Sequence, residues 1–415
     1  MRTDFAHHHL SRRDALKLGA AGAAAAAATA ATAGPVGAAA IEAAEVSGAS
    51  RRRHEKDVSG YDDTMFDFAA AAAGGLWVSP YGPDDERGTL NEVTPEKTAH
   101  SLRILRRTRP VNSYQLGESM FNGFPAFPSD PPRLHDMFLY ALGYDAGADF
   151  VAGGGIQAGT EPLGPNKVIG NEERFGENFT FQIGSQIDGL GHVGIGTDDD
   201  RGGRFYNDIY ANDIATPTGT TRLGNETMGP IATRAVIIDV VGMKVADGAT
   251  DDCFVAANGQ PVLRDNYRIT IEDIQHALRR QRIRRPIGPG DVVIFHTGWT
   301  HLVTSDPGRY LTQEPGIYLA EARYLIDRKV AIAATDTWGL EVLDPAVTGG
   351  NAFPVHQELL GRTGIRIGES FVTDDAIADH CYEGVLVVTP ENVPGATAGS
   401  TPPMLLGQPG RAPRY

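Results

Sequence analysis

Short apolar runs alternate with amphipathic segments through the second half of the chain, and this alternation constrains the fold most. The strand-like runs are Ala235–Val241, Asp291–Phe295, Val330–Ala334 and Gly384–Val388. The segments between them predict helices at about residues 269–281, 316–328 and 355–361. Strands that alternate with helices indicate a layered α/β core. Polar residues follow several of the strands, and binding sites of such sheets usually lie at that edge.

The first forty residues resemble an export signal. A twin arginine, Arg12-Arg13, precedes an Ala/Gly-rich run, and Ala38-Ala39-Ala40 offers a small-residue cleavage site. This pattern predicts export by the twin-arginine route to the periplasm or the extracellular space. A membrane anchor is the alternative, although a run made mostly of alanine is only weakly driven into a bilayer. We expect no membrane span after residues 1–40 are removed, because no later segment is apolar enough.

The rest of the chain divides into a short linker and one large domain. Residues 41–74 are polar near their start and are predicted to be a linker, whereas residues 75–415 can bury a sizeable core. Removing residues 1–40, with four basic and two acidic side chains, changes the formal charge from −15 to −17. A surface that is this acidic argues against nucleic acid or anionic lipid as a partner, and it says little about a small-molecule substrate.

The segment from Gln182 to His192 carries the most informative polar pattern. It follows an apolar run at residues 179–183 that predicts a strand, and Gln182, Gln186, Asp188 and His192 recur at even spacings. On an extended backbone this parity would place the four side chains on one face. A carboxylate and an imidazole that converge there suit a divalent cation. A polar sheet face without a ligand explains the same spacing equally well.

Familiar catalytic motifs are absent from the sequence. It contains no Gly-x-Ser-x-Gly elbow, no phosphate-binding loop and no His-Glu-x-x-His pair. What remains is a dispersed set of groups, each of which is more often structural than functional when it stands alone: Asp188, His192, His296, His356 and Glu369.

Together with the polar segment, these residues resemble the cyclase-like metal hydrolases. That family includes bacterial kynurenine formamidase, isatin hydrolase and trans-dienelactone hydrolase. Its signature, His-x-Gly-Thr-His-x-Asp-x-x-x-His, corresponds here to residues 182–192. Further pieces match in family order between about residues 75 and 405: Glu86–Asn91, Pro230–Arg234, Pro289–Trp299, Asp336–Glu341, Phe353–His356 and Gly368–Ser370.

The resemblance implies a fold and a metal centre. The family fold is a swivelling β/β/α arrangement, with mixed β-sheet layers backed by helices, and we expect this chain to form a homodimer or a larger assembly. By position, Asp188, His356 and Glu369 are kept as ligands of a divalent metal, zinc or manganese. Gln182 and Gln186 stand where the family has two metal-binding histidines. An amide oxygen binds zinc more weakly than imidazole does, so one good metal site and one degraded site are expected.

The resemblance also implies an activity. We expect metal-dependent hydrolysis of a C–N or C–O bond in a small cyclic or acylated substrate: a formamide, amide, imide or lactone. His192 would shuttle a proton between water and the leaving group, and candidate walls of the substrate pocket are His296, Trp299 and His135. Two alternatives stay open. The chain could bind a small molecule without catalysis, or it could be a lyase or isomerase in which His192 acts as the base.

Overall fold

The computed structural model describes residues 60–75, 77–144, 150, 153–159, 161–197, 200–400 and 402–412. A mixed nine-stranded sheet dominates it, with the strand order β1-β16-β14-β8-β11-β12-β13-β5-β15. The α/β class predicted from the alternating pattern is therefore confirmed. In this order the strands are Asn112–Gln115, Met404–Gly407, Glu383–Val388, Ile231–Asp239, Val292–His296, Ile332–Thr335, Arg366–Glu369, Gln186–Asp188 and Ala398–Gly399.

Four central strands, β8, β11, β12 and β13, run parallel. Side chains of β8 alternate between two cores: Val236 and Ile238 belong to one cluster, and Ala235 and Ile237 to another. The predicted strand at 235–241 is too long at its end. Val240 begins the helix α6, because the Asp239 side chain accepts a hydrogen bond from the Gly242 amide and caps that helix.

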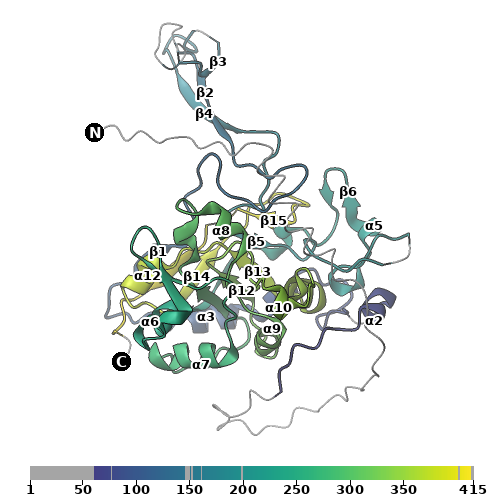
Figure 1. The fold of residues 1–415 in the computed structure, drawn as a ribbon. Helices are drawn as coiled ribbons and strands as arrows, with labels where there is room; N and C mark the ends of the chain where they lie inside the picture. Colours follow the sequence, from purple (N-terminus) through teal and green to yellow (C-terminus); the bar gives the residue numbers. More distant parts are fainter. Residues whose placement is uncertain are drawn as a thin grey trace.

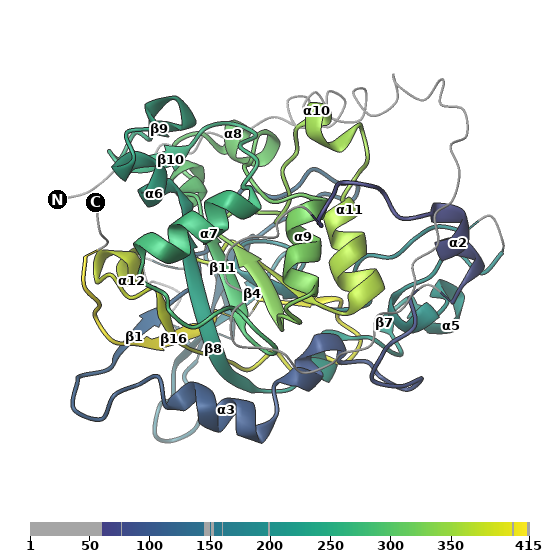
Figure 2. The same cartoon turned by 90° about the horizontal axis from the view of Figure 1, so that it is seen from below.

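Helices cover one face of the sheet, and β1, β14 and β16 help to enclose a second core on the other face (Figures 1 and 2). The first face carries α6 (Val240–Ala246), α7 (Ile271–Arg280), α9 (Leu319–Ile326) and the π-helix η6 (Gln357–Thr363), which continues α11 (Pro354–His356). These positions confirm the three helices predicted from the sequence. Against β8 lies α3 (Pro95–Leu102), and shorter helices lie elsewhere: α2 (Phe68–Ala73), α5 (Ala211–Ile214), α8 (Pro307–Thr312), α10 (Pro345–Thr348) and α12 (Asp374–Ala378).

The polar segment enters this sheet differently from the prediction. Residues 179–183 form no strand, and the strand β5 contains only Gln186, Ile187 and Asp188. Gly184 has a φ of +68°, which interrupts any extended run before β5. The shared face predicted from even spacing therefore applies to Gln186 and Asp188 alone. Strand β5 lies antiparallel to β13, with Gln186 opposite Glu369.

A three-stranded sheet stands away from the body (Figure 1). It contains β2 (Met137–Leu142), β3 (Ile156–Ala158) and β4 (Gly170–Phe175), in the order β3-β2-β4. We call residues 137–175 the arm. Two small hairpins complete the strands: β9 (Cys253–Val255) with β10 (Pro261–Leu263), and β6 (Ala215–Thr216) with β7 (Gly219–Thr220).

The predicted export signal at residues 1–40 lies outside the described residues, as does most of the predicted linker at 41–74. None of the helices in the described part of the chain combines the length and apolar character that a membrane crossing requires.

Candidate metal centre

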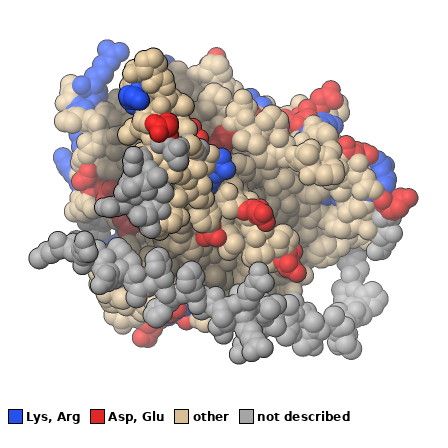
Figure 3. All heavy atoms as spheres, turned by 90° about the horizontal axis from the view of Figure 1, so that it is seen from above, with Lys and Arg blue, Asp and Glu red and all other residues tan. Residues whose placement is uncertain are grey.

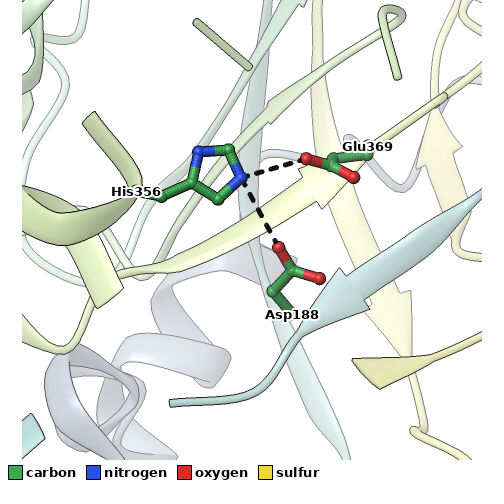
Figure 4. Close-up of side chains that lie close together, drawn as sticks. All are labelled: Asp188, His356 and Glu369. Atoms are coloured by element: carbon green, nitrogen blue, oxygen red, sulfur yellow. Dashed lines mark hydrogen bonds and ion pairs between the residues drawn. The ribbon is translucent and has the colours of Figure 1, made fainter. Parts of the chain in front are cut away.

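Three buried side chains from three elements converge at the end of β13. Asp188 ends β5, Glu369 ends β13 and His356 ends α11 (Figure 4). One ligand atom from each lies within 4.8 Å of the other two. His356 Nε2 is 3.3 Å from Glu369 Oε1 and 3.8 Å from Asp188 Oδ2. The structure thus brings together the three metal ligands that the resemblance implied.

Glu341 fixes the imidazole of His356. Its Oε1 lies 2.6 Å from His356 Nδ1, and its two oxygens also accept the backbone amides of Val355 and His356, each at 3.1 Å. Because a carboxylate only accepts hydrogen bonds, Nδ1 carries the proton and donates it to Glu341. Nε2 then faces the two other carboxylates, which is the orientation of a metal-ligating histidine held by a second carboxylate.

The electrostatics of the cluster fit a cation. Burial raises the pKa of Asp188 to about 6, although the nearby imidazole of His192 acts to lower it. Burial alone would lower the pKa of His356, but its hydrogen bonds to Glu341 and Glu369 raise it well above its usual value. Asp188 Oδ2 is buried without a hydrogen-bond partner among the described residues. A buried carboxylate oxygen without a partner is costly, and a bound cation would satisfy it.

The two glutamines link Glu369 to His192 through a chain of hydrogen bonds. Gln186 Nε2 donates to Glu369 Oε2 at 2.6 Å and to Gln182 Oε1 at 2.8 Å, and Gln182 Nε2 lies 3.2 Å from His192 Nδ1. We call this chain the glutamine relay. An ionised Glu369 can only accept, so it fixes the orientation of Gln186 and then of Gln182. Gln182 must therefore donate to His192 Nδ1.

The glutamine relay determines which nitrogen of His192 carries the proton. Burial lowers the pKa of His192, which favours the neutral ring. With Nδ1 accepting from Gln182, the single proton resides on Nε2, and Nε2 lies 4.0 Å from Asp188 Oδ2. The side chain is 21 % exposed and borders the cavity. His192 therefore offers an N–H donor beside the three ligand atoms.

A cavity of about 230 Å³ opens onto this cluster. Its aromatic wall contains Phe127, Trp338 and Phe353, whose rings pack with centroids 5.1 to 6.2 Å apart. Arg133 adds a cation, and its Nη1 lies 3.5 Å from the Gln182 carbonyl oxygen. Phe127 and Arg133 belong to the Pro- and Phe-rich segment 121–135, which forms an irregular loop over the site.

Sequence reasoning missed a further buried carboxyl group. Burial raises the pKa of Glu314 well above its usual value. Glu314 Oε2 accepts the Gly339 amide at 3.0 Å, whereas Oε1 has no partner among the described residues. No motif surrounds Glu314, so nothing local could have identified it. Glu341, in contrast, lies inside a segment that already matched the family.

The three residues predicted as substrate-pocket walls lie outside the lining of the cavity. Trp299 is fully buried, and its Nε1 donates to the Tyr310 carbonyl oxygen at 2.9 Å, so it lies behind a residue that does line the cavity. His135 packs against Phe175 and Phe179 at the base of the arm. His296, at the end of β11, faces Asp336.

His296 should make stability fall as the pH rises above neutrality. Burial opposes its charge, but the hydrogen bond to Asp336 and the fields of Asp239 and Asp374 raise its pKa from 6.5 to about 9. Because the pKa of His296 is higher in the folded than in the unfolded protein, its protonated ring stabilises the fold. This contribution to the free energy of unfolding is fully present below about pH 6.5 and is lost as the pH rises through about 9. We expect the free energy of unfolding of the wild-type protein to fall by on the order of 2–3 kcal/mol between pH 6.5 and 9.

Urea unfolding at several pH values measures the effect. His296→Gln should remove most of the pH dependence between 6.5 and 9 because the amide does not titrate. The control is His276→Gln, on the exposed side of α7. Equal slopes in wild type and His296→Gln would show that His296 is neutral in the folded protein.

A family model identifies the family of this chain. A family model described as "Putative cyclase" matches residues 114–342. A solved structure described as a novel cyclase is similar at 26 % identity and a TM-score of 0.61, covering 79 % of this chain and 98 % of its own. Isatin hydrolase A from Ralstonia solanacearum is similar at 17 % identity and a TM-score of 0.45, covering 71 % and 92 %.

Another similar structure is a predicted metal-dependent hydrolase from Bacillus stearothermophilus. It has 16 % identity and a TM-score of 0.40, and the match covers 72 % of this chain and 98 % of that one. A search of the curated proteins found no match.

Proposed function

Because this chain belongs to the cyclase family, we propose that it is a metal-dependent hydrolase of a C–N or C–O bond in a small cyclic or acylated molecule. The observation that carries the proposal is the buried group of Asp188, His356 and Glu369, which opens into a cavity beside His192. We further propose that Gln182 and Gln186 mark a branch of the family in which these positions are not histidines.

The three ligands would hold one divalent cation, zinc or manganese. A cation there supplies Lewis acidity, which polarises a carbonyl group and makes water a stronger nucleophile at neutral pH. Gln186 Nε2 donates hydrogen bonds to Glu369 and Gln182, so the only atom of the Gln186 amide left to contact a cation is Oε1, which is buried without a partner among the described residues. Gln182 and Gln186 are therefore poor ligands for a second cation.

His192 would act as a hydrogen-bond donor to the reacting group. A neutral imidazole with its proton on Nε2 can donate to the oxygen that gains charge when water adds to a carbonyl carbon. The same tautomer cannot accept a proton at Nε2. The glutamine relay therefore supports a narrower role than the expected proton shuttle, and it disfavours a lyase or isomerase in which His192 is the base.

The size and lining of the cavity support a small, partly apolar substrate. A volume of about 230 Å³ suits a compact molecule, and the rings of Phe127, Trp338 and Phe353 would pack against a planar or apolar part of it. Arg133 would attract an anionic group at the same wall.

Metal analysis and a substrate screen test the proposal. The purified chain should retain one divalent cation after dialysis and should hydrolyse some member of a panel of formamides, amides, imides and lactones. Incorporation of oxygen-18 from labelled water into the product distinguishes hydrolysis from lyase or isomerase chemistry. A chain that takes up no stoichiometric metal, even after loading, would be a binding protein instead.

Replacing Gln182 should change the protonation of His192 without unfolding the protein. Gln182→Met removes the donor to Nδ1, and Gln182→Glu offers an acceptor that favours a proton on Nδ1. Nitrogen-15 spectra of histidine-labelled protein should therefore show Nε2–H in wild type and Nδ1–H in Gln182→Glu. Loss of one hydrogen bond in Gln182→Met should lower kcat by up to about tenfold.

The resonances of His356 serve as the internal control, because its Nδ1 proton is held by Glu341 and not by the glutamine relay. A His192 tautomer that is the same in all three proteins would refute the proposed role of Gln182.

A further inference from the structure

Two stretches of the chain concentrate positive charge in a protein that is acidic overall. Residues 97–117 contain five lysine and arginine side chains and no aspartate or glutamate, and residues 274–290 contain five and none. We call the seven arginines within 103–109 and 282–285 the arginine patch, and six of them are exposed. The formal charge of −15 argues against an anionic partner, but it averages over this uneven distribution.

The fold brings the two stretches together at β8. Arg234, a buried residue of this strand, donates from its backbone amide to Ser101 Oγ at 2.9 Å and from its guanidinium to the Arg285 carbonyl oxygen at 2.8 Å. Ser101 lies in the last turn of α3, and Figure 2 shows α3 at the periphery of the molecule, where the chain continues into the loop that leads to β1. The two arginine stretches are therefore neighbours.

The charge of the arginine patch is not neutralised by ion pairs. Arg280, just before the patch, pairs with Asp247. For the seven arginines of the patch, in contrast, no ion pair with a carboxylate is found in the part of the chain that the structure describes. The exposed imidazole of His100 is subject to the resulting field, because the positive charge of Arg285, and to a smaller extent that of Arg103, lowers the pKa of His100.

Exposed apolar side chains flank the first arginine stretch. Leu102 is 46 % exposed at the end of α3, and Val111 is 44 % exposed just before β1. Residues 103–111 and 282–290 contain no aromatic side chain, the group on which sites for single-stranded nucleic acid stack bases. Cations beside exposed aliphatic groups suit a lipid–water interface, where phosphate groups meet the cations and acyl chains accept the apolar groups.

We propose that the arginine patch, together with Leu102 and Val111, docks the protein on an anionic lipid surface. The acidic residues do not prevent docking, because they are dispersed, and Figure 3 shows them at many separate places on the face seen from above. At physiological salt the Debye length is about 8 Å, so the charges nearest to the lipid dominate. An arginine guanidinium can also donate two hydrogen bonds to one phosphate group.

The arginine patch and the candidate metal centre are separate. The helix α3 lies against β8, whereas Glu369 ends β13, and β11 and β12 stand between these two strands in the sheet. No arginine of the patch lines the cavity. The docking proposal is therefore independent of the proposed activity, and we expect kcat on a soluble substrate to be the same with and without vesicles.

Co-sedimentation of the full chain with lipid vesicles tests the proposal. The protein should bind vesicles that contain phosphatidylglycerol, should not bind vesicles of phosphatidylcholine alone, and should be released by about 1 M salt. Arg106→Gln combined with Arg107→Gln should weaken binding by at least about tenfold, because each arginine near an anionic surface contributes about fivefold. The matched control is Lys167→Gln combined with Arg174→Gln, which removes the same charge from exposed positions of the arm.

Variants of Leu102 test the apolar contact. Leu102→Trp adds an exposed tryptophan, whose emission should shift to shorter wavelength when phosphatidylglycerol vesicles are added. Leu102→Gln should weaken binding severalfold because it removes apolar surface that the lipid would cover. An unchanged emission spectrum on bound vesicles would show that Leu102 does not enter the interface and would overturn its part in the proposal.

Equal vesicle binding by the two double variants would refute the arginine patch as the docking surface, since both keep residues 1–59 and binding would then come from elsewhere in the chain. Failure of wild type to bind phosphatidylglycerol vesicles at low salt would refute it directly. A duplex DNA fragment that binds as tightly as the vesicles, and that Leu102→Gln leaves unaffected, would make the patch a site for polyanions in general. Self-association that Arg106→Gln with Arg107→Gln abolishes would identify the occupant as an acidic surface of a second copy instead.

Discussion

Asp188→Asn is expected to abolish metal binding and to lower hydrolytic activity at least about a thousandfold. A catalytic cation is worth several kcal/mol in the transition state, and each 1.36 kcal/mol is a factor of ten in rate. The neutral amide keeps the shape of the side chain but removes the charge that attracts the cation. Metal content by elemental analysis, and kcat on the best substrate of the panel, measure the two losses.

The same substitution should leave the metal-free fold at least as stable as wild type. It removes a buried carboxylate whose Oδ2 has no partner among the described residues. Added metal should then raise the Tm of wild type and not that of the variant. Asp239→Asn is the matched control for metal binding, since Asp239 is also buried but lies outside the group of three ligands, where it caps α6 and acts on His296. A variant that still binds one cation tightly would show that Asp188 is not a ligand.

His192→Ala should lower kcat by about a hundred- to a thousandfold while the metal content stays at the wild-type level. This is the usual cost of removing one preorganised donor to a developing oxyanion. Nε2 of His192 is not among the three convergent ligand atoms, so the cation should remain. Stopped assays at saturating substrate give kcat, and elemental analysis gives the metal.

His276→Ala, on the exposed side of α7, controls for the loss of an imidazole. A His192→Ala protein that keeps its metal and more than about a tenth of wild-type kcat would remove His192 from the mechanism. If the metal is lost as well, His192 is a ligand, and the donor must be another group of the cavity wall.

The sequence predicted the repeating part of the fold well and the connections poorly. Strands such as β11 and β12 are continuous apolar runs because both of their faces are buried, and such runs are visible without any structure. The start of helix α3 is marked in the sequence by its cap Thr94 and by Pro95, whereas nothing comparable marks its end at Leu102. No strand was predicted in the arm; β4, for example, shows no alternation of apolar and polar residues.

The candidate site also contains residues that the sequence could predict and residues that it could not. Asp188, His356 and Glu369 could be proposed because their positions match a family signature. The positions of His296, Trp299 and His135 depend on how loops pack, and no local pattern encodes that. The glutamine relay was equally invisible, since it depends on Gln186 facing Glu369 across two strands that are far apart in sequence. Even spacing suggested a shared face for four residues, yet bends and hydrogen bonds bring them together instead.

The pairing of β5 with β13 has a consequence for the order of folding. The two strands bring together residues 183 positions apart, Gln186 and Glu369, so the metal ligands come from distant parts of the chain. Contacts of such long range form slowly, because a large loop must close before they stabilise anything. A chain in which β5 and β13 have not yet paired holds no complete ligand set, and a nascent chain cannot capture the cation before β13 is made. Occupancy of the site would then report that these two distant strands have paired, so metal uptake during refolding would measure the formation of this long-range contact.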